Sequence, residues 1–151
     1  MARPKEFDPD DALEKAMHQF WSKGYFDTSI RDLIDRTGVN YYGLYGEFGN
    51  KHGLFLAALD RYRDTVTAEA LKELDGPGSI HETILRMFGR LSELTRTPDG
   101  RVGCLMCNTA VEVAPTDEDA AAKVKAHRKL IEKALTAALT RAKDKGEIAA
   151  D

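Results

Sequence analysis

Two cysteines, at positions 104 and 107, are the side chains in this sequence best suited to covalent chemistry. Gly103 precedes Cys104 at an expected helix start, where free N–H groups and the helix dipole lower the pKa of a thiol, and Arg101 adds a nearby cation. Cys107 lies one turn further on the same face and could act as a resolving thiol. Cys104 is therefore the candidate sensor of electrophiles or oxidants. The alternative is inert packing, because free cysteines are among the most buried residues.

Other kinds of reactive site find little support in the sequence. The Cys-x-x-Cys pair could bind zinc, but with His81 and His127 scattered elsewhere it lacks a four-ligand spacing, so we predict no metal site. No glycine-rich phosphate loop, HExxH motif, serine elbow or paired-carboxylate cleft can be placed. We therefore expect a protein that is not an enzyme and that carries no cofactor.

The elements that must position the reactive residues are helices, because apolar residues recur at spacings of three and four along the chain. The first expected helix has an acidic start at Asp8 and stops at Gly24. Thr28 or Ser29 can cap a second, short helix that ends at Gly38.

Residues 40–48 are poor helix formers, since Gly43 and Gly46 each cost roughly 1 kcal/mol relative to alanine. A β-segment here would have no partner strand elsewhere in the sequence, and Leu44 and Phe48 keep an i, i+4 apolar pair. We therefore predict a helix against the local propensity.

The rest of the chain has the same helical pattern. Asn50 caps a long helix to about Leu74, and the break at residues 75–78 is a hinge candidate. The remaining expected helices have an apolar face of Ile80, Ile84, Leu85, Phe88 and Leu91, a short apolar run from Cys104 to Val113, and a last helix from Asp117 to Gly146. The prediction is an all-α fold.

Length and charge bound the organisation further. A chain of 151 residues has room for one compact domain, or for a small helical head and a larger helical body that share a continuous core. Through residue 60 there are seven Lys and Arg against ten Asp and Glu, so the head is not basic. DNA binding would then depend on a few well-placed cations and neutral donors, with a shallow salt dependence.

The stretch FWSKGYFDTSIRDLIDRTGVNYYGLYGEFGNKHGLFLAAL resembles the N-terminal signature of the TetR family of bacterial transcription regulators. The match runs from Leu13 to about Tyr62. It implies a three-helix head with a helix-turn-helix, residues 1–50, on a helical ligand-binding and dimerisation body, residues 51–151.

The resemblance also implies which residues contact DNA. The implied set is Arg3 and Lys5 in a basic arm, Thr28 and Arg31 on the second helix, Asn40, Tyr41, Tyr42, Gly43 and Tyr45 on the recognition helix, and Lys51 at the start of the fourth. Chemistry supports several of these roles: Lys51 adds a cation to the free N–H groups of a helix N-terminus, which favours phosphate. Gly43 would let the helix approach the groove closely, and the tyrosines offer hydroxyls and ring edges. Tyr45 could instead be a core residue and Arg31 a surface charge.

In the body, RVGCLMCNTAVEVAP resembles a TetR subgroup that responds to N-ethylmaleimide and related electrophiles. Such bodies bind a small molecule and change the spacing of two recognition helices. The candidate ligand and sensor residues are Tyr62, Phe88, Cys104, Cys107, Asn108 and His127. Core packing is the alternative for Tyr62, Phe88 and His127.

We therefore expect a cytoplasmic repressor that binds a palindromic double-stranded operator as a homodimer and is released by a small molecule or electrophile. Neither a signal peptide nor a membrane span is expected. Compared with the family, the body is expected to lack the last dimerisation helices. A helical protein-binding adaptor without DNA binding is the alternative.

Overall fold

The computed structural model describes residues 7–98 and 100–149, and all regular structure in these ranges is helical. The elements are α1 (Pro9–Lys23), α2 (Ile30–Thr37), α3 (Tyr41–Phe48), α4 (Lys51–Tyr62), the π-helical η1 (Arg63–Thr67), α5 (Ala68–Lys72), η2 (Glu73–Asp75), α6 (Ile80–Leu94), η3 (Gly100–Val102), α7 (Leu105–Glu112) and α8 (Glu118–Asp144). The all-α fold expected from the sequence is confirmed.

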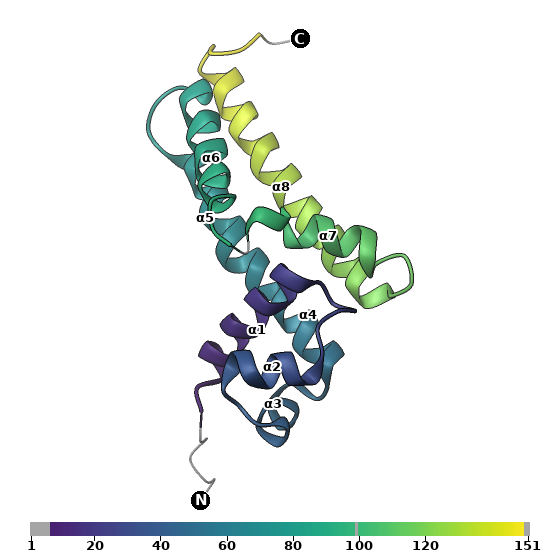
Figure 1. Cartoon of the computed structure of the whole chain (residues 1–151). Helices are drawn as coiled ribbons and strands as arrows, with labels where there is room; N and C mark the ends of the chain where they lie inside the picture. Colours follow the sequence, from purple (N-terminus) through teal and green to yellow (C-terminus); the bar gives the residue numbers. More distant parts are fainter. Residues whose placement is uncertain (1–6, 99, 150–151) are drawn as a thin grey trace, which may run out of the picture.

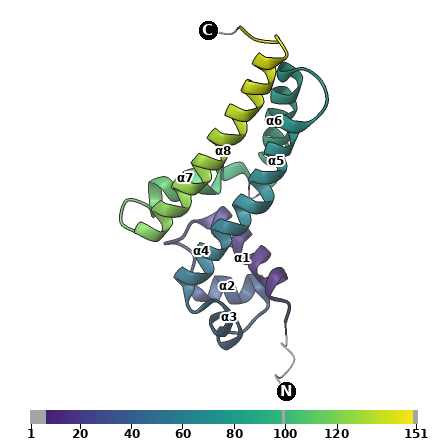
Figure 2. The ribbon, with the colours of Figure 1, turned by 180° about the vertical axis from the view of Figure 1, so that it is seen from behind.

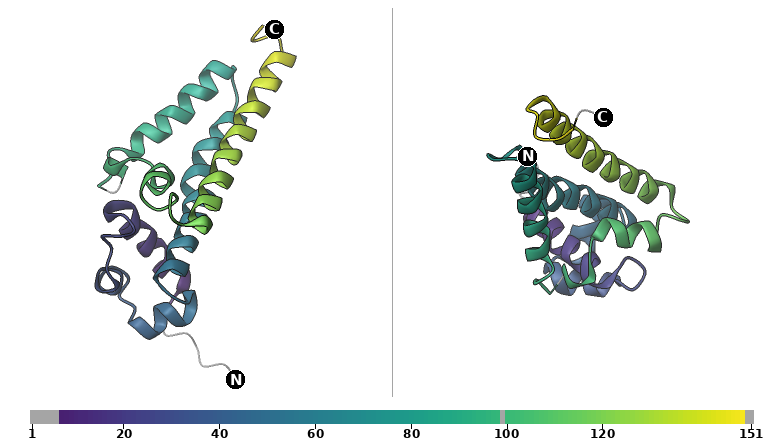
Figure 3. Two further views of the ribbon diagram at one scale, coloured as in Figure 1. Left: turned by 90° about the vertical axis from the view of Figure 1, so that its right-hand side faces the viewer. Right: turned by 90° about the horizontal axis from the view of Figure 1, so that it is seen from above.

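The molecule is elongated, with two halves joined by one long helical rod. The segments α4, η1, α5 and η2 follow one another without a break, and this rod starts among α1–α3 and ends between α6 and α8 (Figure 1). The view from behind shows the same order, with α7 lying where the two halves meet (Figure 2). Figure 3 shows α2 and α3 at the end of the molecule that lies away from the C-terminal end of α8. A movement of the rod would therefore displace the helices packed against it in both halves.

Local capping explains where the short helices begin. Ser29 and Asp32 form a capping box on α2, in which Ser29 Oγ accepts a hydrogen bond from the Asp32 amide. Asn40 caps α3 by accepting from the Gly43 amide at 2.9 Å, and Asn50 caps α4 in the same way. Of the two residues expected to cap α2, the structure selects Ser29.

The main core crosses from one half to the other. Phe20 and Phe55 pack edge to face with ring centroids 5.1 Å apart, and Trp21 meets Tyr62 at 5.0 Å. Residues of α7 and α8 close the same cluster. Burial of each large side chain contributes on the order of 1.5–3 kcal/mol, so the head and the adjoining body stabilise each other.

The apolar face expected on α6 is wrong in part. Thr83 and Met87 are the buried residues of this helix, whereas Leu85, Phe88 and Leu91 are exposed. The reason is that α6 packs against the rod and α8 along one side. The exposed residues Leu85, Phe88 and Leu91 lie on another side of α6.

None of the described helices is long and apolar enough to cross a membrane.

Candidate nucleic-acid interface and sensor site

The second and third helices form a compact pair at the end of the molecule. Gly38 adopts a positive φ of 73°, which lets the chain turn sharply after α2. Leu33 and Leu44 bury one side of each helix in the main core. Their opposite sides are left exposed, which is the arrangement that a helix-turn-helix needs to enter a groove.

The exposed side of α3 carries two tyrosines. Tyr42 is 84% exposed, and Tyr41 is 48% exposed with its ring edge-on to those of Tyr42 and Tyr45. Asn40 is exposed too, but its side-chain oxygen is engaged in capping. Tyr41 and Tyr42 are therefore well placed to offer hydroxyls and ring edges to a nucleic acid.

Two residues of α3 face inward instead. A Cβ at Gly43 would lie 2.8 Å from Cγ1 of Val39 and 3.1 Å from the Phe7 ring, so internal packing by itself accounts for a glycine here. The hydroxyl of Tyr45 is buried without a hydrogen-bond partner among the described residues. A phosphate contact by Tyr45 would require this ring to move.

The predicted DNA contacts outside α3 also differ in how accessible their side chains are. Thr28 is fully buried, and its hydroxyl donates to the Gly24 carbonyl at 2.6 Å, so its side chain is not available to DNA. The Arg31 side chain is 90% exposed on α2. Lys51 is the first residue of α4, and its Nζ lies 4.5 Å from the centroid of the Tyr25 ring. Burial lowers the pKa of Lys51, and nearby carboxylates such as that of Glu112 oppose this. Arg3 and Lys5 lie outside the described residues.

The candidate sensor residues fall into two groups. Cys104, Tyr62 and His127 come together where α7 meets the rod and α8. Cys104 is the N-cap residue of α7, while Tyr62 and His127 are buried. Burial alone would raise the pKa of Cys104, but hydrogen bonds with His127 and Tyr62 and the amides at the start of α7 lower it to about 6. These contacts therefore favour the thiolate form of Cys104 more than water favours that of an ordinary cysteine.

The other three candidates lie elsewhere. Cys107 is exposed, and partial burial of its thiol together with the neighbouring Cys104 raises its pKa. The Asn108 amide donates to the Val102 carbonyl and lines a different groove, of about 380 Å³, between α1 and α7. Phe88 is exposed on α6. The structure thus does not bring Phe88 or Asn108 into a pocket with His127.

Two contacts between the halves were not predicted from the sequence. The Trp21 indole donates a hydrogen bond to the Gly103 carbonyl, and a Glu112 carboxylate oxygen accepts from the Phe26 amide. Both contacts tie α7 and the loop before it to the head. The sequence gives no signal for either contact. Trp21 lies on the apolar face of one helix and Glu112 at the end of another, and each hydrogen-bond partner is more than eighty residues away.

Comparison with known proteins assigns the family. The family model of bacterial regulatory proteins of the tetR family matches residues 12–58, and the model of the tetracyclin repressor-like C-terminal domain matches residues 80–151. The HTH-type transcriptional repressor ComR of Escherichia coli (strain K12) is 37% identical over 147 residues, which cover 97% of this chain and 70% of ComR. The chain belongs to the TetR family. It is a DNA-binding transcriptional regulator.

Further TetR proteins support the assignment along most of the chain. The uncharacterized HTH-type transcriptional regulator YezE of Bacillus subtilis (strain 168) is 35% identical over 148 residues, covering 98% of this chain and 76% of YezE. A cysteine mutant of the TetR family regulator CifR, complexed with 26-base-pair operator DNA, superposes with a TM-score of 0.87 at 29% identity. That match covers 99% of this chain and 78% of the CifR chain, so both the head and the body have the TetR fold.

Proposed function

We propose that this TetR regulator represses its target genes by binding a palindromic operator as a homodimer, with α3 in the major groove. The observation that carries the proposal is the exposed Tyr41 and Tyr42 surface of a firmly capped α3. One short helix reads few base pairs, and a two-fold dimer doubles the site. The CifR mutant, which shares this fold, is complexed with double-strand operator DNA, and this supports operator binding by the present chain.

The roles of individual residues follow from their exposure. Asn40, Tyr41 and Tyr42 would contact bases or phosphates, and Arg31 and Lys51 would contact the backbone. Residues 1–50 would act as the DNA-binding unit and residues 51–151 as the regulatory body, with the rod that begins at α4 as the joint. We infer that the protein works in the bacterial cytoplasm, where its DNA is, and that it is a regulator without catalysis of its own.

We further propose that an electrophile releases the operator by reacting with Cys104. The thiolate sulfur would add to the carbon–carbon double bond of a reagent such as N-ethylmaleimide, forming a C–S bond, and the resulting carbanion would take a proton from water. The lowered pKa of Cys104 supports this reaction at neutral pH. The added group would then disturb the contacts that join the start of α7 to the head.

A gel-shift experiment tests DNA binding directly. A duplex pool with randomised palindromes is selected on the full chain, and the selected duplex competes against random DNA. We expect specific binding of two chains per duplex, lost when Tyr41 and Tyr42 are both replaced by alanine. Equal affinity for selected and random duplexes, or no binding at low salt, would instead favour a helical adaptor.

A further inference from the structure

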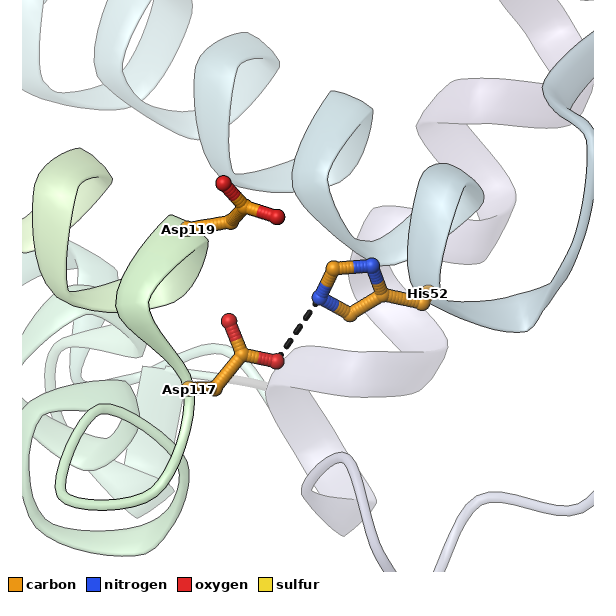
Figure 4. Close-up of side chains that lie close together, drawn as sticks. All are labelled: His52, Asp117 and Asp119. Atoms are coloured by element: carbon orange, nitrogen blue, oxygen red, sulfur yellow. Dashed lines mark hydrogen bonds and ion pairs between the residues drawn. The ribbon is translucent and has the colours of Figure 1, made fainter.

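A histidine and two aspartates meet at a second junction between the halves, away from the cysteines. His52 lies in the first turn of α4, while Asp117 and Asp119 lie at the start of α8 (Figure 4). One ligand-type atom from each of the three residues lies within 4.8 Å of the other two. The residues are far apart in the sequence, so only the fold brings them together.

Two of these side chains are already held in position. One Asp117 carboxylate oxygen accepts from the Ala120 amide at 2.8 Å as the cap of α8, and the other lies 2.7 Å from His52 Nε2. The His52 ring also packs edge-on to Tyr25, with centroids 6.5 Å apart. A site whose ligands are fixed by such neighbours loses less entropy when it binds an ion.

The charges in this cluster are not balanced. Asp119 makes no hydrogen bond or ion pair through its carboxylate with any residue in the described ranges, although this group points toward the His52 side of the cluster in Figure 4. No lysine or arginine in the same ranges forms an ion pair with Asp117. Two carboxylates thus face one imidazole.

We propose that His52, Asp117 and Asp119 bind a divalent transition-metal ion that clamps the start of α4 to the start of α8. One imidazole nitrogen with carboxylate oxygens suits ions such as Zn²⁺, Co²⁺ or Ni²⁺, and water would complete the coordination. Bonds of about 2.0–2.2 Å place neighbouring ligand atoms roughly 3–3.5 Å apart, so His52 Nε2 and the Asp117 oxygen, now 2.7 Å apart, would separate slightly and Asp119 would move inward. The exposed and unpartnered Asp119 side chain can supply that movement.

The position of the site makes it a candidate regulatory site. Lys51, our proposed phosphate contact, directly precedes His52 and opens the same helix. A bound ion would fix the angle between α4 and α8, and hence the position of α3 relative to the body. The clamp would therefore change operator affinity without touching DNA.

Metal binding is measured on the full chain with both Cys104 and Cys107 replaced by serine, so that thiols do not compete. We expect this protein to bind one Co²⁺, with visible absorption bands typical of nitrogen and oxygen ligands, and one Zn²⁺ by calorimetry. Mg²⁺ should bind much more weakly, since it rarely takes imidazole. Asp119→Asn should weaken Zn²⁺ binding by about tenfold or more.

Glu118→Gln is the matched control, because it removes an exposed charge from the same turn of α8 outside the cluster. It should bind Zn²⁺ like its parent. No saturable binding, or equal Zn²⁺ affinity in Asp119→Asn and its parent, would show that the cluster is only a His52–Asp117 ion pair. Operator affinity should also change between Zn²⁺ and EDTA in the parent and not in Asp119→Asn. The same response in both proteins would overturn the clamp.

Discussion

The indole nitrogen of Trp21 lies 2.6 Å from the backbone carbonyl oxygen of Gly103, to which it donates a hydrogen bond that joins α1 of the head to the loop that leads into α7. Gly103 is followed immediately by Cys104. A group added to the Cys104 sulfur therefore forms one residue away from a contact with the DNA-binding half. The bond gives a direct route by which chemistry at the thiol can reach the head.

Trp21 can report on that contact, because it is the one tryptophan in the chain. We expect N-ethylmaleimide to shift its fluorescence emission to longer wavelength as the indole loses its partner and gains water. Cys104→Ser should abolish the shift, and the matched Cys107→Ser should keep it. An emission spectrum that does not change when mass spectrometry shows Cys104 fully modified would contradict the coupling.

The pH dependence of Cys104 labelling is a second prediction. Only the thiolate reacts, so the labelling rate should rise with pH and reach half its maximum near pH 6, the lowered pKa of Cys104. An ordinary thiol would show its midpoint at about 8.5. Iodoacetamide labelling over a pH series, followed by mass spectrometry of each cysteine, measures both sites.

A substitution of His127 tests whether its hydrogen bond helps to lower the pKa of Cys104. His127→Gln removes a group that favours the thiolate, so the midpoint for Cys104 should move to higher pH. The exposed His81, on α6, provides the control, and His81→Gln should leave the midpoint unchanged. If the parent protein itself titrates near the ordinary value, the contacts of Cys104 do not activate it.

Lys51 should contribute to DNA affinity without contributing to specificity. Lys51→Gln is expected to weaken binding to the selected operator and to random duplex by similar factors. The slope of log affinity against log salt should fall by about one unit, since one phosphate contact is lost. Fluorescence anisotropy at several salt concentrations measures this slope. Lys125→Gln, an exposed lysine on α8, is the control, and an equal effect of both substitutions would refute the placement of Lys51.

Tyr42 should instead affect which sequence is bound. Tyr42 is 84% exposed, so Tyr42→Ala should not disturb the fold. We expect the variant to discriminate less between the selected operator and single-base-pair changes, each of which should normally cost roughly 1–3 kcal/mol. Competition binding measures these differences. Unchanged discrimination at every position would mean that Tyr42 reads no base.

The two glycines inside α3 should respond in opposite ways to alanine. A Cβ at Gly46 meets nothing within 4 Å, so Gly46→Ala should raise the free energy of unfolding by about 0.5–1 kcal/mol. Gly43→Ala places a methyl group against Val39, and overpacking of about 1–3 kcal/mol should cancel or exceed the gain. Urea unfolding followed by circular dichroism compares them. An equal increase in the free energy of unfolding in both variants would show that the Val39 side chain moves enough to accommodate the methyl group.

The helices and the helix-turn-helix could be predicted from the sequence because their signals are local. Asn40 and Asn50 cap their helices through amides three residues ahead, so type and spacing suffice to place both helix starts. The same holds for the turn at Gly38. Even the helix at residues 40–48, which propensity disfavours, followed from the lack of any partner strand.

The sites were only partly predictable. Thr28 and Gly43 fit a DNA-contacting pattern by type, yet one is buried and the other packs on Val39. Phe88 has an apolar side chain at helical spacing, but it lies on the exposed side of α6. Spacing along a helix shows which residues share a face, and it does not show which neighbour covers that face.

By itself, the sequence determined that the chain is all helical, where its helices begin, and that its head resembles a TetR helix-turn-helix. The tertiary structure alone decided that Cys104 meets His127, that Trp21 bonds to Gly103 and that His52 lies beside Asp117. The physical reason is distance along the chain. A cap or turn depends on backbone geometry within a few residues, whereas these contacts depend on how α4, α7 and α8 pack against one another across the shared core.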